Sequence, residues 1–153
     1  MMSLCCDVLK ALSGKTLVTA ESCTGGGIGA ALTAVAGSST VYKGGVISYT
    51  DWVKEHILGV DGELLARCGA VSSEVAKEMA IGARRLLQAD VALSVTGLAG
   101  PGGDDYGNPV GTVYIGCAMH TTVAVEAHRF SGDRESVRNQ AVAAALELVL
   151  KTV

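Results

Sequence analysis

The chain has few charged side chains, and those it has form no basic cluster. Only 18% of its 153 residues are Asp, Glu, Lys or Arg, the formal net charge is −3, and no run of Lys and Arg occurs. Proteins whose main task is nucleic-acid binding usually carry concentrated positive charge. The composition therefore argues against nucleic acid as the main partner.

Long apolar runs are also missing, although 49% of the residues are hydrophobic. No uninterrupted apolar segment reaches the roughly 20 residues that a membrane-spanning helix needs. Residues 1–7 lack the basic segment, apolar stretch and cleavage site of a secretory signal. We therefore expect no membrane partner and a cytoplasmic location, with the apolar residues forming a core.

Neither cysteine nor histidine follows a metal-binding pattern. The five cysteines are Cys5, Cys6, Cys23, Cys68 and Cys117, an odd number whose spacing matches no zinc site or disulfide framework. The three histidines, His56, His120 and His128, also lack a spacing partner. We expect no metal site, and we expect most of the cysteines to be small buried hydrophobes in a reducing compartment.

Glycine is abundant instead, with 20 residues, and many glycines separate segments that are typical of strands and helices. The predicted strands are Lys15–Ala20, Val41–Tyr49, Asp90–Thr96, Val110–Met119 and Val123–Phe130. The predicted helices cover residues 3–13, 25–35, 51–58 and 61–68, a segment that begins at 72 or 73, and the end of the chain from 133. Strands that alternate with helices and then form a hairpin predict one three-layer α/β/α domain over residues 1–153, with a mixed, mostly parallel sheet.

Helix ends and faces can also be predicted. We expect Asp51, Asp61, Ser72 or Ser73, and Asp133 to cap the helices that follow them. The helix after Ser73 carries one face with spacings of four, three and four residues, formed by Val75, Met79, Gly82 and Leu86. The last helix carries a second apolar face, formed by Val137, Ala141, Ala144, Ala145 and Leu148.

The segment Ala20–Gly27 places three hydroxyl or thiol side chains, Ser22, Cys23 and Thr24, where a strand ends and a helix begins. Because a helix start stabilises anions, Ser22 could be a nucleophile with an oxyanion or phosphate site beside it. Cys23 is a rival nucleophile, since a helix start lowers the pKa of a thiol. Helix capping by Ser22 or Thr24 is the commoner role. The spacing fits neither the G-x-S-x-G motif nor the P-loop.

Tyr49 and Lys54 form a second candidate group. Tyr49 ends a predicted strand, and Lys54 lies in the first turn of the next predicted helix. A lysine there meets the unfavourable end of the helix dipole, and exclusion of water would lower its pKa further. Such a lysine can take the proton of a serine hydroxyl, with Tyr49 as relay or orienting group. An ordinary surface lysine beside a tyrosine is the alternative that the local sequence favours.

Two further segments could bind an anion. Thr96–Gly103 is a glycine-rich stretch after a buried strand, and its N–H groups could hold a phosphate, although a mobile surface loop would look the same. Arg134 begins the last helix and suits bidentate binding of phosphate or carboxylate. Ion pairing with Asp133, Glu135 or Glu55 is the alternative. All these groups fall at strand ends, where open α/β sheets bind ligands.

Taken in order, these motifs resemble the CinA C-terminal domain family, which includes stand-alone nicotinamide mononucleotide deamidases. The matching segments are Thr19–Gly26, Ala36–Ser39, Gly44–Tyr49, Lys54, Leu58–Val60, Gly69–Ser72, Glu78–Ala83, Thr96–Pro101, Pro109–Val113 and Phe130–Arg134. The resemblance implies hydrolysis of the amide of nicotinamide mononucleotide to nicotinate mononucleotide and ammonia. It also implies a serine amidohydrolase that uses neither a metal nor a cofactor.

The resemblance assigns roles to individual residues. Ser22 would be the nucleophile, and Lys54 with Tyr49 the base system. The positions associated with substrate binding are Ser39, Thr96 and Arg134. Glu21 would support the site from beside the nucleophile. Independently of the resemblance, we expect a helix cap and backbone N–H donors from Thr24, Gly25 and Gly26, with Gly97 as a further N–H donor.

Two departures and two alternatives accompany this resemblance. Asn108 stands where many relatives carry a lysine, which weakens any expectation of a cation from that loop. The large N-terminal domain of many relatives, which resembles molybdopterin-binding proteins, is not present in the 153 residues, so we expect no pyrophosphatase activity. A non-catalytic nucleotide-binding module and an amidohydrolase with another substrate are the alternative functions. The sequence leaves homo-oligomer formation open.

Overall fold

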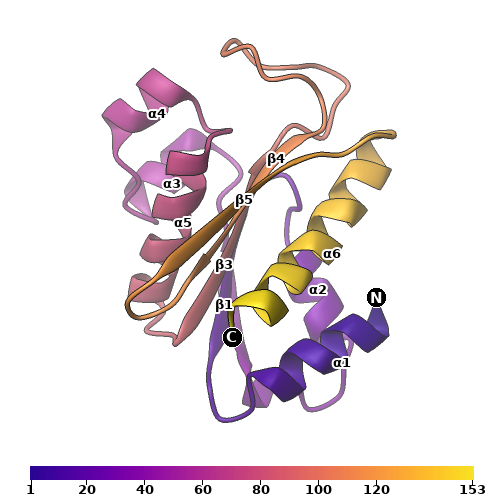
Figure 1. Cartoon of the computed structure of the whole chain (residues 1–153). Helices are drawn as coiled ribbons and strands as arrows, with labels where there is room; N and C mark the ends of the chain where they lie inside the picture. Colours follow the sequence, from indigo (N-terminus) through magenta and orange to yellow (C-terminus); the bar gives the residue numbers. More distant parts are fainter.

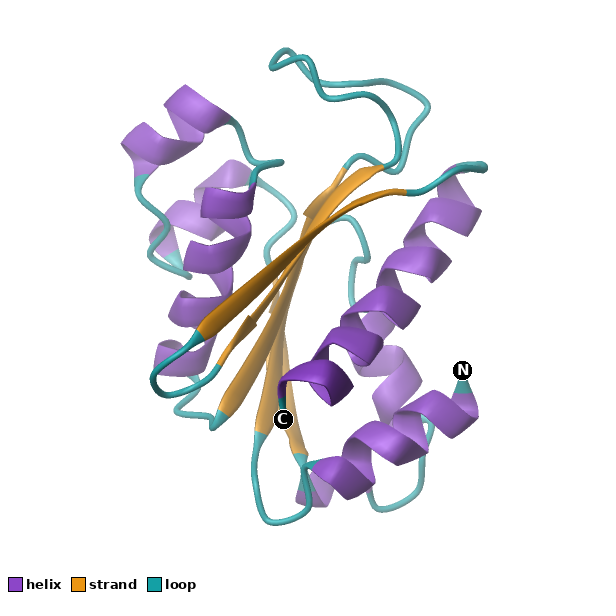
Figure 2. Cartoon of the chain, viewed as in Figure 1, coloured by secondary structure: helices purple, strands orange, loops and turns teal.

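The computed structural model describes all 153 residues and arranges them in three layers (Figures 1 and 2). The strands of the central sheet are β1 (Leu17–Glu21), β2 (Tyr42–Ile47), β3 (Val91–Gly97), β4 (Thr112–Ala118) and β5 (Val123–Arg129). One face of the sheet is covered by α1 (Met2–Ala11), α2 (Gly27–Thr33) and α6 (Arg134–Thr152), and the other by α3 (Asp51–His56), α4 (Gly62–Cys68) and α5 (Ser73–Leu86). A short 3₁₀ helix, η1 (Ser38–Thr40), precedes β2.

The sheet is mixed and mostly parallel, as predicted. Its strand order is β2-β1-β3-β4-β5. β1 runs parallel to β2 and β3, whereas β4 is antiparallel to both β3 and β5. It follows that β4 alone is reversed. The carboxyl ends of β1, β2 and β3 therefore meet at one edge of the sheet, and the chain enters α6 from the same edge.

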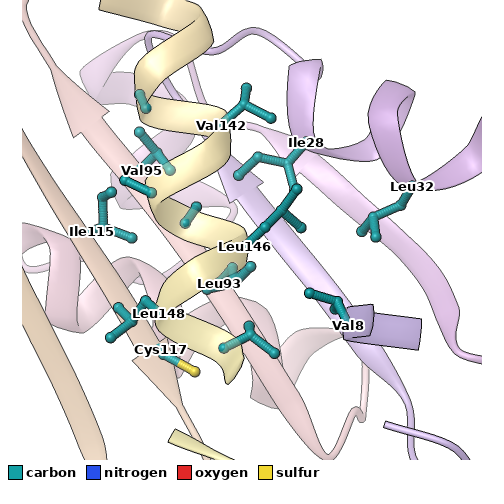
Figure 3. Packing of buried hydrophobic residues seen from close by; sticks show 14 of the residues in the cluster. Val8, Ile28, Leu32, Leu93, Val95, Ile115, Cys117, Val142, Leu146 and Leu148 are labelled. Atoms are coloured by element: carbon teal, nitrogen blue, oxygen red, sulfur yellow. The ribbon is translucent and has the colours of Figure 1, made fainter. Parts of the chain in front are cut away.

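Two apolar clusters hold the layers together. The larger has 23 buried residues between the sheet and α1, α2 and α6. Figure 3 shows its centre, where Leu146 of α6 lies near Leu93 of β3 and Val142 of α6 lies near Ile28 of α2. The smaller has 13 buried residues, mostly between the sheet and α4 and α5. At roughly 25 cal/mol per Å² of apolar surface removed from water, these clusters are the main stabilising term.

The apolar faces predicted for the two long helices are largely confirmed. All five residues predicted for α6 are buried, and so are Val75 and Met79 of α5. Gly82 also lies on the inner face, where a Cβ would collide with the carbonyl oxygen of Leu58. Leu86 is the exception at 50% exposed. It is the last residue of α5, so its spacing continues the face beyond the last buried residue, Ala83.

Three of the four predicted caps are confirmed. The side chains of Asp61, Ser72 and Asp133 each accept a backbone N–H of their own helix, at 3.0, 3.2 and 2.9 Å. Asp51 is not a cap, because Thr50 occupies that position and Asp51 is the first helical residue of α3. Its carboxylate therefore stands beside the helix start as a charge rather than as a backbone acceptor. None of the six α-helices is both long and apolar enough to cross a membrane.

Candidate active site

A cavity of about 300 Å³ opens at the edge of the sheet where β1, β2 and β3 end. The register places Glu21 of β1 opposite Ile47 of β2 and Val95 of β3. The residues that follow these strands therefore lie side by side. The cavity is lined by Ser22, Cys23, Tyr49, Asp51, Lys54, Ala70, Val71, Thr96, Gly97, Leu98, Ala99, Gly100, Gly102 and Arg134.

Ser22 and Lys54 form the centre of this site. The Lys54 amine donates to Ser22 Oγ at 2.9 Å and to the Ser48 carbonyl oxygen at 2.7 Å. Lys54 is only 1% exposed, Ser22 only 7%, and Lys54 takes part in none of the salt bridges. Burial lowers the pKa of Lys54, and the Asp51 carboxylate opposes this shift only in part. A serine hydroxyl is thus held against an amine that is biased toward its neutral form.

The predicted direction of the Lys54 pKa shift is confirmed, but the predicted contribution of the helix dipole is wrong. α3 has only six residues and Lys54 is the fourth, so it also belongs to the last turn. The effect of the dipole is confined to the terminal turns of a helix. Burial is therefore the physical cause, and burial depends on the tertiary structure.

α3 reverses the usual distribution of side chains on a surface helix. Its one buried residue is the lysine, whereas Trp52 is 61% exposed and Ile57, just after the helix, is 42% exposed. Lysine is almost never fully buried unless its charge is compensated or lost. Such an inversion is typical of a functional site rather than of a core.

Glu21 occupies the anion position at the start of α2. Its carboxylate is 2% exposed and accepts the backbone N–H groups of Ile28 at 2.8 Å and Gly29 at 3.1 Å. It also accepts the hydroxyl of Thr24 at 2.7 Å. The predictions that Thr24 caps this helix and that the helix start binds an external anion are therefore wrong. Gly26, in a left-handed conformation, is the N-cap residue.

Two backbone N–H groups next to Ser22 have no backbone partner. The Ser22 amide donates to Val95 O and the Gly25 amide to Ser22 O, whereas the amides of Cys23 and Thr24 have no backbone partner. Arg138 of α6 donates to the carbonyl oxygens of Cys23 and Thr24, at 3.0 and 3.2 Å. Because the peptide is planar and trans, this contact turns the Thr24 N–H away from α6. Arg138 was not predicted as a site residue, although it lies one helical turn after Arg134.

The surroundings of Cys23 disfavour its role as a rival nucleophile. Burial raises the pKa of its thiol to about 11. The thiolate, which is the reactive form, is therefore scarce at neutral pH. The predicted lowering at a helix start fails because Cys23 lies four residues before α2 and is 6% exposed. It lines the cavity as an uncharged thiol.

Arg134 joins α6 to the glycine-rich loop. Its guanidinium donates to the Gly100 carbonyl oxygen at 2.6 Å and to the Tyr49 hydroxyl at 3.2 Å. It takes part in none of the salt bridges, so the alternative of ion pairing with neighbouring acids is not observed. Tyr49 is 58% exposed and its hydroxyl contacts Arg134, not Ser22 or Lys54. The amine of Lys54 reaches Ser22 directly, so the contacts do not require Tyr49 as a proton relay.

The end of β3 and the loop that follows it contact the neighbouring segments at several points. Thr96 donates its hydroxyl proton to Ala70 O at 2.8 Å, and the Asn108 amide donates to Val71 O at 3.1 Å. The Tyr106 hydroxyl donates to Ala66 O at 2.9 Å. A Cβ at Gly97 would collide with β4 at Val113. This loop forms the long arch above the sheet in Figure 1, and its first residues line the cavity.

Six of the residues predicted for the site line one cavity, namely Ser22, Tyr49, Lys54, Thr96, Gly97 and Arg134. Four others, Glu21, Thr24, Gly25 and Gly26, are close to Ser22 in sequence but do not line the cavity. Ser39 is wrong as a residue of this site, because η1 precedes β2 and so lies at the opposite edge of the sheet. Asp51 lines the cavity and was not predicted there. No group of three or more His, Cys, Asp or Glu side chains is placed to hold a metal ion.

The structural class is a three-layer α/β fold. At the carboxyl edge of its sheet, a serine is hydrogen-bonded to a buried lysine. The sequence profile of the CinA C-terminal domain matches residues 2–153, and the chain belongs to this family. A CinA-like protein of Geobacter sulfurreducens is 47% identical over 134 residues, which are 88% of this chain and 32% of that protein. One of Synechococcus sp. is 56% identical over 115 residues, 74% of this chain and 27% of that protein.

Solved structures agree with this assignment. The crystal structure of a competence-damaged protein (CinA) superfamily protein from Klebsiella pneumoniae superposes with a TM-score of 0.96 at 38% identity, covering 99% of this chain and 96% of that one. A competence/damage inducible protein from Agrobacterium tumefaciens gives 0.94 at 38% identity, with 98% and 93% covered. The chain spans about a third of the length of the curated relatives it matches.

Proposed function

We propose that the protein is a serine amidohydrolase that hydrolyses the carboxamide of nicotinamide mononucleotide, giving nicotinate mononucleotide and ammonia. The observation that carries this proposal is the 2.9 Å contact between Lys54 Nζ and Ser22 Oγ, with Lys54 only 1% exposed. An amine biased toward neutrality beside a hydroxyl is the arrangement that general-base activation of serine requires. The choice of substrate rests on the family resemblance and on the charges of the cavity.

In the first step, neutral Lys54 removes the hydroxyl proton of Ser22. A neutral lysine amine has two N–H bonds and one lone pair. One N–H donates to the Ser48 carbonyl oxygen, 2.7 Å away. The lone pair can then accept the proton of Ser22 across 2.9 Å. Tyr49 needs no part in this transfer, and it contributes by orienting Arg134.

In the second step, Ser22 Oγ bonds to the carboxamide carbon and the carbonyl electrons move to oxygen. The free N–H groups of Cys23 and Thr24 are the donors that could stabilise this oxyanion, each worth roughly 3 kcal/mol in comparable sites. The C–N bond then breaks, and the nitrogen takes the proton from Lys54 and leaves as ammonia. The positive charge of the pyridinium ring withdraws electrons from the carboxamide and favours the attack.

In the third step, water cleaves the ester on Ser22. Lys54 takes a proton from the water, the resulting hydroxide attacks the acyl carbon, and the ester C–O bond breaks. Ser22 Oγ recovers its proton from Lys54, and nicotinate mononucleotide leaves. The sum is one amide and one water converted to one acid and one ammonia, with the enzyme unchanged.

Arg134 is the group best suited to the phosphate. A guanidinium has five N–H donors, and the contacts with Gly100 and Tyr49 use two of them. The others can bind phosphate oxygens. The N–H groups of the glycine-rich loop, beside Arg134 in the cavity, could add further donors.

The decisive experiment is ammonia release from nicotinamide mononucleotide by wild type and by Ser22→Ala. We expect turnover by wild type and a loss of at least about a thousandfold in the folded variant, since the nucleophile is absent. A Cys23→Ser variant is the matched control and should retain most activity. Near-normal turnover by Ser22→Ala would refute the assignment of the nucleophile.

A nucleotide-binding module without catalysis is the second candidate. Binding alone does not require a lysine buried against a serine hydroxyl, so the geometry favours the enzyme. Calorimetric titration with nicotinamide mononucleotide, run beside the ammonia assay, separates the two functions. Tight binding by wild type without ammonia release would favour the module. Ammonia released from other amides but not from nicotinamide mononucleotide would indicate an amidohydrolase with another substrate.

A further inference from the structure

Asp51 is the only carboxylate that lines the cavity, and the mechanism gives it no task. It is exposed, is the first residue of α3, and takes part in none of the salt bridges. Acidic residues near a helix start are favourable for the helix itself. That ordinary role does not require the side chain to face a ligand cavity.

The charges of the cavity are separated between two helix starts. Besides Lys54, the acidic and basic side chains that line it are Asp51 at the start of α3 and Arg134 at the start of α6. Lys54, also in the cavity, is biased toward its neutral form because burial lowers its pKa. A cavity lined by one carboxylate and one guanidinium is complementary to a ligand that carries both a positive and a negative charge.

We propose that Asp51 determines substrate specificity by recognising the positive charge of a cationic heteroaromatic ring, while Arg134 binds the anionic end of the same molecule. This inference rests on the proposed function. The carboxamide must reach Ser22 Oγ, so the ring that bears it lies next to Lys54 and Ser22. Asp51 lines the same cavity as Ser22 and Lys54, and it lies three residues before Lys54 on the same short helix. The substrate class is therefore a zwitterionic pyridinium nucleotide rather than a neutral amide.

The size of the effect follows from the exposure of Asp51. In water, the attraction between two unit charges about 4 Å apart corresponds to roughly a fivefold change in affinity. Because Asp51 is exposed, we expect its removal to weaken binding of a cationic ring by about threefold to tenfold. The effect should shrink in high salt, since salt screens exposed charges within roughly 10 Å.

The experiment compares nicotinamide mononucleotide with its reduced dihydropyridine form, which has the same phosphate, ribose and carboxamide but an uncharged ring. Binding is measured by calorimetry in a Ser22→Ala background, which prevents turnover, with and without Asp51→Asn. We expect Asp51→Asn to weaken binding of the cationic form by about threefold to tenfold and of the reduced form by less than about twofold. About 0.5 M salt should reduce this difference.

Two further variants serve as controls. Asp51→Glu keeps the charge and should retain the preference for the cationic ring. Glu63→Gln removes an exposed carboxylate from the first turn of α4, away from the cavity, and should change neither affinity. Glu63→Gln therefore shows how much affinity changes when a carboxylate is removed from a helix start that lies away from the cavity.

Each outcome has a distinct meaning. Equal weakening of both ligands by Asp51→Asn, or no weakening of either, would overturn the role of Asp51 while leaving the hydrolase intact. Wild type that neither binds nicotinamide mononucleotide nor releases ammonia from it would refute the proposed function, and this inference with it. A variant that melts well below wild type is replaced in the comparison by Asp51→Ser, judged by the same ratio of affinities.

Discussion

α3 and α5 cover the same face of the sheet, and they are built on opposite principles. α5 has 14 residues, a Ser72 cap and an inner face that includes Val75 and Met79, both 0% exposed. α3 has six residues, no side-chain cap bond, and Lys54 as its only buried residue. The first arrangement maximises stability and the second does not. The difference indicates that α3 is held in place to deliver an amine to Ser22, while α5 holds the sheet.

The largest expected effect tests the role of α3. Replacing Lys54 with Met keeps the length of the side chain but removes the base. We expect ammonia release from nicotinamide mononucleotide to fall by roughly 10²- to 10⁴-fold, the usual contribution of a general base, with the circular dichroism spectrum unchanged. Loss of folding instead of turnover would mean that α3 is structural and that the comparison with α5 is wrong.

The next effect tests the role of α5. Met79→Ala leaves a cavity in the smaller apolar cluster, and should lower the free energy of unfolding by about 2–5 kcal/mol. The turnover number of the folded fraction should stay near that of wild type, because Met79 does not line the active-site cavity. Denaturant unfolding and the ammonia assay measure the two quantities separately. A large drop in the turnover number with unchanged stability would contradict the division between the two helices.

A pH dependence follows from the lowered pKa of Lys54. Neutral lysine is the reactive form, so kcat/KM should rise with pH through the folded-state pKa of Lys54. The free energy of unfolding should also rise with pH. The unfolded pKa is about 10.4, and the folded pKa is lower. Between these two values the unfolded chain binds the Lys54 proton and the folded chain does not. The free energy of unfolding is therefore smaller there than at a pH above both values. As pH rises through this window, wild type should gain stability relative to Lys54→Met.

Denaturant unfolding of both proteins from pH 7 to 10 tests this difference. Subtracting the Lys54→Met values removes the titration of all other groups to first order. A difference that stays flat with pH would mean that Lys54 is charged in the folded protein. In that case it could not act as the base in its resting state.

The smallest effect compares the two helix caps. Ser72→Ala removes an acceptor that bonds the Val75 N–H at 3.2 Å, and should lower the free energy of unfolding by about 1 kcal/mol. Thr50→Ala is the matched change at the N-cap of α3, where no side-chain bond exists, and should change it by less than about 0.5 kcal/mol. Thermal melting resolves the two. Equal losses would mean that α3 depends on its cap as α5 does.

Much of this architecture was predictable because it follows from local patterns. The apolar spacing of α6 and the polar residues before α4, α5 and α6 predicted their buried faces and caps, since helix periodicity and capping act within a few residues. Ser22 and Thr96 were predicted because polar or glycine-rich segments follow buried strands at these positions. Arg134 was predicted because it begins the last helix. The strand boundaries were less accurate. β2 ends at Ile47 rather than Tyr49 because the Ser48 carbonyl oxygen turns toward Lys54 instead of a neighbouring strand.

The errors share one physical origin, which is that each depends on groups distant in sequence. Cys23 and Ser22 are neighbours, yet burial suppresses the thiol and leaves the serine beside an amine. Glu21 fills the helix start that was expected to bind a ligand. Ser39 matches the family motif, but it lies just before β2 and therefore at the edge of the sheet opposite the cavity. The composition of the chain and the spacing of its residues do not predict where these side chains lie in the folded protein.

The sequence by itself determined the elements, their order and the family, because periodic burial and turn chemistry are local properties. Only the tertiary structure decided the chemistry of the site. Strand order β2-β1-β3 and its register bring Ser22 to within 2.9 Å of Lys54, 32 residues away. Burial then makes this amine a candidate base, and Asp51 becomes the carboxylate of the cavity. Distance and exclusion of water belong to the assembled fold, and they turn an ordinary lysine into a candidate catalytic residue.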